Sequence, residues 1–124
     1  MIEYASLNEN YILQWFPELE KQVTEETEWL GEFLPHAVFG AVLNPLAVKL
    51  LLQDDYKTNT VLKRLFEMYE EMSSNGDLET QNLVQVTLLE PLWDDRTTFL
   101  RAAELIGEQT RAAWKDIASY IAAP

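Results

Sequence analysis

One amphipathic pattern dominates the middle of the chain: residues 59–72 have the sequence NTVLKRLFEMYEEM. The apolar side chains recur every three or four positions, whereas the charged side chains fall mostly on the other side. The apolar set is Val61, Leu62, Leu65, Phe66, Met68, Tyr69 and Met72. This spacing predicts an α-helix that packs one face into a core.

The sequence after this helix predicts a turn and a second helix. Residues 73–77, SSNGD, are typical of a turn, and Asp77 is placed to cap the helix that follows. That helix is expected to reach about residue 90. Its stretch Val84–Leu88 also alternates like a β-strand, but the length of the capped segment and its helical neighbours favour a helix.

Two further helices are predicted after Pro91. The first is expected to open at Asp94 or Asp95 and to stop at Gly107. The second covers residues 108–122 and has the cleanest apolar stripe in the chain.

The N-terminal half is also helical by its periodicity, although less regularly. One helix is predicted to end at Pro17, and another to cover residues 18–30. The apolar run 36–43 is short, and Asn44-Pro45 then predicts a cap and the first turn of a new helix to about Gln53.

These segments predict an all-α fold of about six to seven helices, in a single helical domain over residues 1–124. A chain of this length can bury a sizeable core, and it has no cysteine for disulfides or thiolate metal sites. The short connections favour antiparallel hairpins. We expect either an irregular helical bundle or a short HEAT-like array of such hairpins.

The charge of the chain restricts its partners. It carries 21 acidic and 9 basic side chains, a formal net charge of -12. Such a surface repels phosphate backbones and anionic lipids, so we expect neither nucleic acid nor membrane as a partner. Residues 1–35 are the most negative part, with eight acids and one base around Trp15 and Trp29. This region is either a solvated helix face or a docking surface.

No segment of the sequence suggests export or membrane insertion. The first residues lack the basic start and apolar run of a secretory signal. The longest apolar stretch, Ala37–Leu52, is interrupted by Gly40, Asn44, Pro45 and Lys49. A cytoplasmic location is expected.

The sequence offers little for catalysis or metal binding. His36 is the only imidazole and is expected to be a hydrogen-bonded structural residue. Glu67, Glu70 and Glu71 have the helical spacing that could hold a divalent cation, but the Glu-x-x-His element of di-metal bundles is missing, and a solvated face is favoured. We predict no catalytic residue, metal or cofactor, and no enzyme.

Two features near Pro91 deserve separate predictions. Glu90 is expected to be partly buried and paired with Arg64 or Arg101. Trp93 lies at a corner between helices, and we expect it near the surface. There, with Asp94 and Asp95, it could anchor a basic partner, although a corner tryptophan that packs over a helix end is an equal alternative.

Trp15, Trp29 and Trp114 are expected to be mostly in the core by their spacing.

Three stretches carry a resemblance to a known family. They are LPHAVFG at 34–40, FEMYEEM at 66–72 and, above all, NLVQVTLLE at 82–90. They resemble a family of small helical bacterial proteins classified as a domain of unknown function, over about residues 15–115. Small acidic helical proteins of this kind resemble the immunity proteins that accompany secreted bacterial toxins. The resemblance implies no catalytic residues.

The favoured hypothesis is a stoichiometric, immunity-like or antitoxin-like inhibitor. It would occlude a basic protein partner, for example a nuclease toxin, by charge and by steric block. The residues predicted to contact this partner are Glu67, Glu70, Glu71, Trp93, Asp94 and Asp95. The alternatives are a carboxylate-based metal-binding or enzymatic domain that uses Glu67, Glu70, Glu71 or Glu90 with His36, and a homo-oligomeric scaffold.

Overall fold

A computed structural model describes residues 1–124 as seven α-helices joined by short turns, one π-helix and three 3₁₀ helices. The α-helices are α1 (Glu9–Trp15), α2 (Glu20–Leu30), α3 (Pro35–Leu51), α4 (Thr60–Asn75), α5 (Leu78–Asn82), α6 (Arg96–Leu105) and α7 (Glu108–Ile117). The π-helix is η3 (Leu83–Leu89), and the 3₁₀ helices are η1 (Tyr4–Ser6), η2 (Pro17–Leu19) and η4 (Glu90–Trp93). The predicted all-α class is confirmed.

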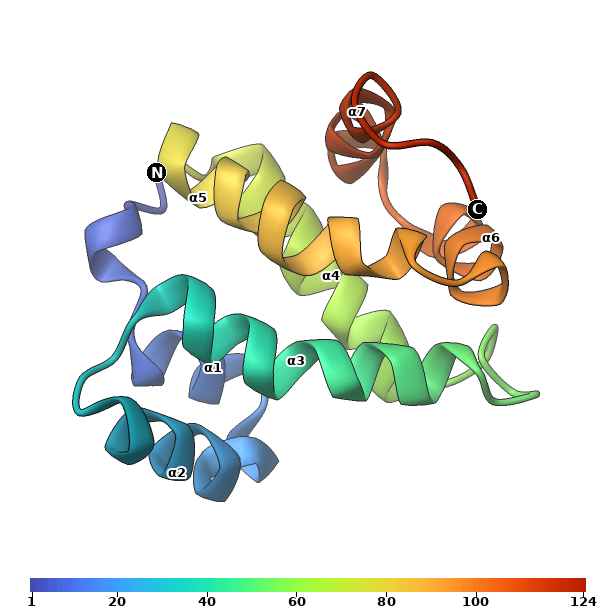
Figure 1. The fold of residues 1–124 in the computed structure, drawn as a ribbon. Helices are drawn as coiled ribbons and strands as arrows, with labels where there is room; N and C mark the ends of the chain where they lie inside the picture. Colours follow the sequence, from blue (N-terminus) through green and yellow to red (C-terminus); the bar gives the residue numbers. More distant parts are fainter.

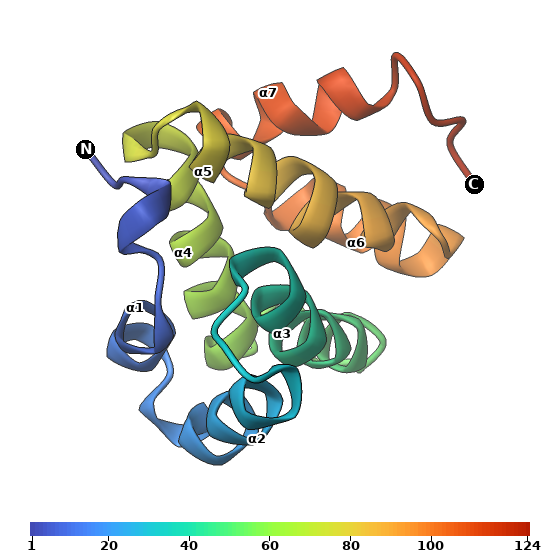
Figure 2. The same cartoon turned by 60° about the vertical axis from the view of Figure 1, so that its left-hand side comes forward.

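Helix α3 lies in the middle of an irregular bundle (Figure 1). Figures 1 and 2 both show α2 on one side of α3 and the continuous helical stretch of α5, η3 and η4 on the other side. Helix α4 crosses behind α3, and α6 and α7 lie beyond η4 (Figure 1). One side of α2 and the adjoining side of α3 therefore form an edge of the molecule.

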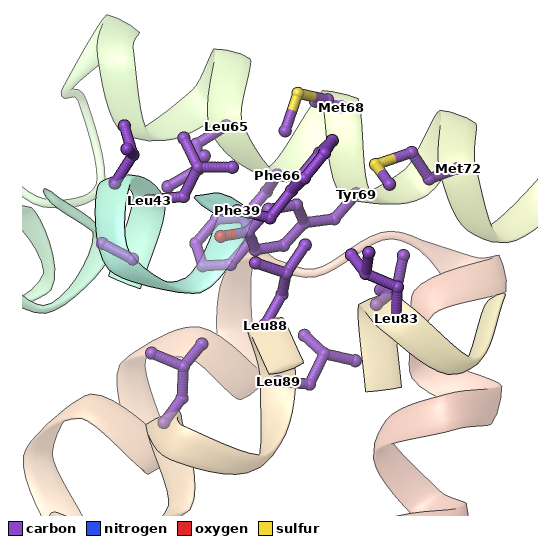
Figure 3. Packing of buried hydrophobic residues seen from close by; sticks show 14 of the residues in the cluster. Phe39, Leu43, Leu65, Phe66, Met68, Tyr69, Met72, Leu83, Leu88 and Leu89 are labelled. Atoms are coloured by element: carbon purple, nitrogen blue, oxygen red, sulfur yellow. The ribbon is translucent and has the colours of Figure 1, made fainter. Parts of the chain in front are cut away.

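The core is formed by 28 buried apolar residues in one cluster. Figure 3 shows how α4, α3 and η3 contribute to it, with Phe66 and Tyr69 of α4 beside Phe39 of α3. The amphipathic pattern of 59–72 predicts this correctly, because every member of its apolar set is buried except Val61, which is half-buried. No helix of the structure is both long and apolar enough to cross a membrane.

The predicted helix break at Asn44-Pro45 is wrong, because α3 continues from Pro35 to Leu51 with Pro45 inside it. The favoured first-turn position is occupied by Pro35 instead. Pro45 has no N–H, so the carbonyl of Ala41 lacks its usual helical donor. Both residues lie on the exposed side of α3, while the opposite side is buried in the core and holds the helix together.

The prediction of a helix at Val84–Leu88 is confirmed, but this helix is of the π type. One α-helical hydrogen bond is missing at the end of this helix because Pro91 has no N–H. It therefore cannot donate to the carbonyl of Thr87, four residues earlier, as an α-helix requires. The side chain of Asn44 takes its place, and its Nδ2 donates to the Thr87 oxygen at 2.9 Å.

Thr87 is one of the residues through which the π-helix contacts α3. His36, Gly40 and Asn44 lie four residues apart and so share one face of α3. Nδ1 of His36 is hydrogen-bonded to Thr87 Oγ1, and a Cβ on Gly40 would lie only 3.2 Å from Thr87 Cγ2. Two of the stretches that carry the family resemblance therefore meet here, and His36 has the structural role expected for it.

The structure corrects several helix ends. The final helix stops at Ile117 rather than near residue 122, and Gly107 is the N-cap of α7, since α6 already ends before Ile106. Of the two candidate caps for α6, Asp95 is used, and its Oδ2 accepts from the Thr98 N–H at 3.2 Å.

The segment before α1 is tied to the turn between α4 and α5. Ile2 forms an isolated bridge with Gly76, in which the Ile2 N–H donates to Asn75 and the Ile2 carbonyl accepts from the Asp77 N–H at 2.9 Å. Asp77 caps α5, as predicted, by accepting from the Thr80 N–H at 2.9 Å.

Candidate functional site

Glu70, one of the six side chains predicted to contact a partner, is bonded inside the fold. Its Oε1 accepts from the N–H and the hydroxyl of Thr110, each at 2.8 Å, and its Oε2 accepts from the Gln109 N–H at 2.9 Å. These donors belong to the first turn of α7, whose N-cap Gly107 has no side chain to offer. Glu70 therefore caps α7 from the neighbouring helix.

This cap makes a pH-dependent contribution to stability. Burial raises the pKa of Glu70, but the three hydrogen bonds from Gln109 and Thr110 outweigh it and hold the pKa below its usual value. A lowered pKa means that the contribution is complete above the ordinary glutamate range and is lost as the pH falls through the folded-state value. We expect Glu70→Gln to reduce the free energy of unfolding by about 1 kcal/mol at neutral pH, measured by urea denaturation.

Glu108→Gln is the matched control for Glu70→Gln, because Glu108 is an exposed acid in the same first turn of α7. Both substitutions remove one negative charge near the same helix end, but only Glu70→Gln replaces an oxygen that accepts from Gln109 or Thr110 with an amide nitrogen that cannot accept. The difference between the two variants should shrink as the pH is lowered toward 3 or so. An equal loss of stability in both would show that only the helix dipole matters.

The other two glutamates of α4 have different surroundings. Glu67 is exposed and lines a cleft of about 450 Å³ together with Lys57 and Lys63. Glu71 accepts a hydrogen bond from the Asn75 amide at 2.8 Å and borders a shallower hollow beside Trp15. The structure contains no group of three or more histidine, aspartate or glutamate side chains placed to hold a metal ion.

The prediction that Trp93 lies near the surface is wrong. Its side chain is 5% exposed and packs against Phe99, at 4.6 Å between ring centroids, and Trp114, at 5.2 Å. The indole is covered by side chains of α6 and α7. This is the alternative given above, in which a corner tryptophan packs over a helix end. Asp94 and Asp95 remain exposed, although Asp95 is engaged as the cap of α6.

Glu90 is half-buried as predicted, but its partner is not an arginine. The hydroxyl of Tyr120 donates to Glu90 Oε2 at 2.8 Å. Arg64 instead forms an ion pair with Glu18 at 3.0 Å, and Arg101 lies over the ring of Tyr56 at 4.4 Å from its centroid.

Three of the arginines donate to backbone carbonyls where helices end. Such carbonyls have no partner within the helix and carry its negative dipole end. The bonds run from Arg64 to the Trp15 oxygen (2.9 Å), from Arg101 to the Leu51 oxygen (2.8 Å) and from Arg111 to the Ala103 oxygen (3.0 Å). A third of the nine basic side chains therefore serves the fold itself.

The expectation that Trp29 lies in the core is also wrong, since its side chain is 83% exposed. Val23 is the buried residue of α2, and Trp29 points away from that side. Glu25 and Glu28 lie within one turn of Trp29, Glu32 follows just beyond Gly31, and all three acids are exposed. An exposed indole among carboxylates thus lies on α2, within the acidic N-terminal third.

A groove of about 380 Å³ lies between α2 and α3. We call it the α2–α3 groove, and it is lined by Leu19, Gln22, Glu25, Glu26, Ala41, Val42, Pro45, Leu46 and Lys49. Glu25 and Glu26 precede Trp29 by four and three residues, so they share its side of α2. The groove and the exposed indole are therefore parts of one surface on α2 and α3.

Comparisons with known proteins place the chain in a family. The comparison with curated proteins gave no match, and neither did the comparison with solved structures. The sequence pattern of the family described as "Domain of unknown function (DUF7674)" matches residues 9–121. This range includes every α-helix of the fold and the three stretches that carry the resemblance. The chain therefore belongs to the family of the domain of unknown function DUF7674.

Proposed function

We propose that the chain is a non-catalytic binding protein that neutralises a basic protein partner, in the manner of an immunity protein or antitoxin. A nuclease toxin is the partner class that fits best, because a nuclease needs a positive surface to hold nucleic acid. An acidic protein that covers this surface blocks substrate access by occupying it and needs no chemistry of its own. The proposal is for a cytoplasmic protein.

The observation that carries the proposal is the outward side of α2. Tryptophan is enriched among the residues that dominate binding energy at protein interfaces. Trp29 is surrounded by exposed carboxylates, which would steer a basic partner toward it. Arg64, Arg101 and Arg111 donate to backbone carbonyls at helix ends. These three cations are therefore used within the fold and do not neutralise the carboxylates around Trp29.

No observation favours the metal-dependent or enzymatic alternative. His36 is bonded to Thr87, and Glu70 is committed to α7. A homo-oligomeric scaffold is likewise not favoured, since a net charge of -12 on each copy opposes self-association.

The proposal is tested by capturing the partner at low salt from the cells that make this protein. The immobilised protein is washed, bound proteins are eluted with a rising salt gradient, and they are identified by mass spectrometry. We expect a stoichiometric basic protein whose association rate with the purified chain falls at least about tenfold between low and high salt.

A growth assay then tests neutralisation. The captured protein is expressed alone and together with this chain, and we expect growth to stop in the first case and to recover in the second. Capture of no basic protein, association that is indifferent to salt, or a captured protein that does not affect growth would each contradict the proposal.

A further inference from the structure

We infer that the α2–α3 groove receives one amphipathic basic helix of the partner, with the apolar side of that helix on α3 and its cations against α2. This inference deepens the proposed function and rests on it, because it assumes a basic protein partner and names the surface and the segment that meet. It differs from the interaction surface predicted from the sequence, which comprises Glu67, Glu70, Glu71, Trp93, Asp94 and Asp95.

The floor of the groove is apolar and belongs to α3. This helix carries apolar residues all around, which is the pattern of a helix covered on every side. Yet Ala41 and Pro45 are exposed, and Leu46 is only partly buried. An apolar strip of this kind is where a second amphipathic helix can pack, as in helix-in-groove recognition.

The same floor contains a backbone acceptor that lacks its helical donor. Pro45 cannot donate to the Ala41 carbonyl, and both residues line the groove. A lysine or arginine side chain of a bound segment could donate to this oxygen. An acceptor inside an apolar strip favours a ligand that combines apolar contact with positive hydrogen-bond donors.

The charges at the rim select the partner and its orientation. Glu25 and Glu26 stand on the α2 side, whereas the cation Lys49 lines the groove at the C-terminal part of α3. Cations of a bound helix would therefore lie beside α2 and away from Lys49. Trp29 extends this rim by one turn and offers a large apolar surface beside the carboxylates.

The rim also argues against a second copy of this chain as the occupant. Two copies would bring together surfaces that each carry Glu25, Glu26 and Glu28 around Trp29. Like charges opposed across an interface disfavour the pairing. Charge complementarity therefore commits the groove to a basic segment.

The test uses a defined peptide and the full chain. The probe is an amphipathic helix of leucine and lysine, about 18 residues long, which corresponds to five helical turns. Both of its ends are blocked. Isothermal titration calorimetry measures its affinity at low salt. We expect one peptide per chain, and no binding by a control peptide in which glutamate replaces lysine.

Variants locate the binding site. Glu25→Gln with Glu26→Gln, Trp29→Ala and Ala41→Lys are each expected to weaken peptide binding at least about tenfold. The matched control, Glu79→Gln with Glu108→Gln, also removes two acidic side chains but lies outside the groove. It should weaken binding less than about threefold, and circular dichroism confirms that every variant is folded.

Three outcomes would overturn the inference. They are absence of binding, equal weakening by the groove variants and the matched control, and a concentration-dependent dimer in sedimentation velocity that Trp29→Ala abolishes. None of these outcomes decides the capture and growth assays, which use no groove variant. A partner that neutralises growth arrest but binds elsewhere would leave the proposed function standing and remove only the groove.

Discussion

Replacing Tyr69 with alanine is expected to lower the free energy of unfolding by about 3–5 kcal/mol, the usual range for removal of a large buried ring. Tyr69 is completely buried, and its ring extends from α4 toward α3 in the centre of the core (Figure 3). It also meets Phe66 edge to face at 5.6 Å between ring centroids. Since small proteins are stable by only about 5–15 kcal/mol, this single change removes much of the total.

The conservative variant Tyr69→Phe is expected to have the opposite sign. The hydroxyl of Tyr69 is buried with no hydrogen-bond partner in the protein, and burial raises its pKa far above the ordinary value. Removing an unpaired buried hydroxyl while keeping the ring should stabilise the protein by about 1 kcal/mol. Urea denaturation of the three proteins measures both effects, and a loss of stability in Tyr69→Phe would mean that the hydroxyl is bonded in solution.

Gly76→Ala is expected to cost about 3 kcal/mol, because the added methyl group has no room. A Cβ at this position would overlap the Met72 carbonyl oxygen and approach Thr80 Cγ2 to 2.7 Å. The first of these atoms belongs to the backbone of α4 and cannot turn aside. The turn between α4 and α5 would have to shift, and the bridge between Ile2 and Gly76 would be strained with it.

Gly31→Ala supplies the control for this prediction. Gly31 has a φ of +82°, which side-chain-bearing residues rarely adopt, but nothing lies within 4 Å of its Cβ position. Its substitution should cost about 1–2 kcal/mol from backbone strain alone. Gly76 has an ordinary φ of -80°, so its larger loss would come from the steric overlap. Hydrogen exchange at the Ile2 amide should accelerate only in Gly76→Ala.

Patterns that repeat along one helix could be predicted from the sequence. The stripe of α4 and the caps Asp77 and Asp95 each depend on residues within a few positions of one another. Their physical causes are local, so a single sequence contains them. The all-α fold follows from such segments taken together.

Features that depend on distant residues could not be predicted in this way. Proline inside α3 is tolerated because its ring faces away from the core, and only the packed structure shows which side that is. The carbonyl of Thr87 in the π-helix accepts from the side chain of Asn44, which is 43 positions away along the chain. The start of α7 at Glu108 was predicted correctly, but Gly107 is the N-cap of α7 rather than the stop of α6, and the acid that caps α7 comes from α4.

The candidate site was anticipated in composition but not in position. The acidic N-terminal third raised the possibility of a docking surface, whereas the residues chosen for contact lay in α4 and around Trp93. Spacing places both Trp29 and Trp93 on apolar patterns, but it does not show which of the two indoles is buried by neighbouring helices. The covering of Trp93 by Phe99 and Trp114 and the exposure of Trp29 are decided by how helices assemble.

The net charge of the chain combines two kinds of charged residue: arginines that the fold requires at helix ends, and surface acids that it does not require. Arg64, Arg101 and Arg111 are fixed by the carbonyls they bind, so their replacement would be penalised in any descendant that keeps this fold. The exposed acids of α2 have no such structural role. Substitutions could therefore change the charge pattern of this surface while the fold beneath it is conserved. Related chains could then differ in the partners they bind without differing in shape.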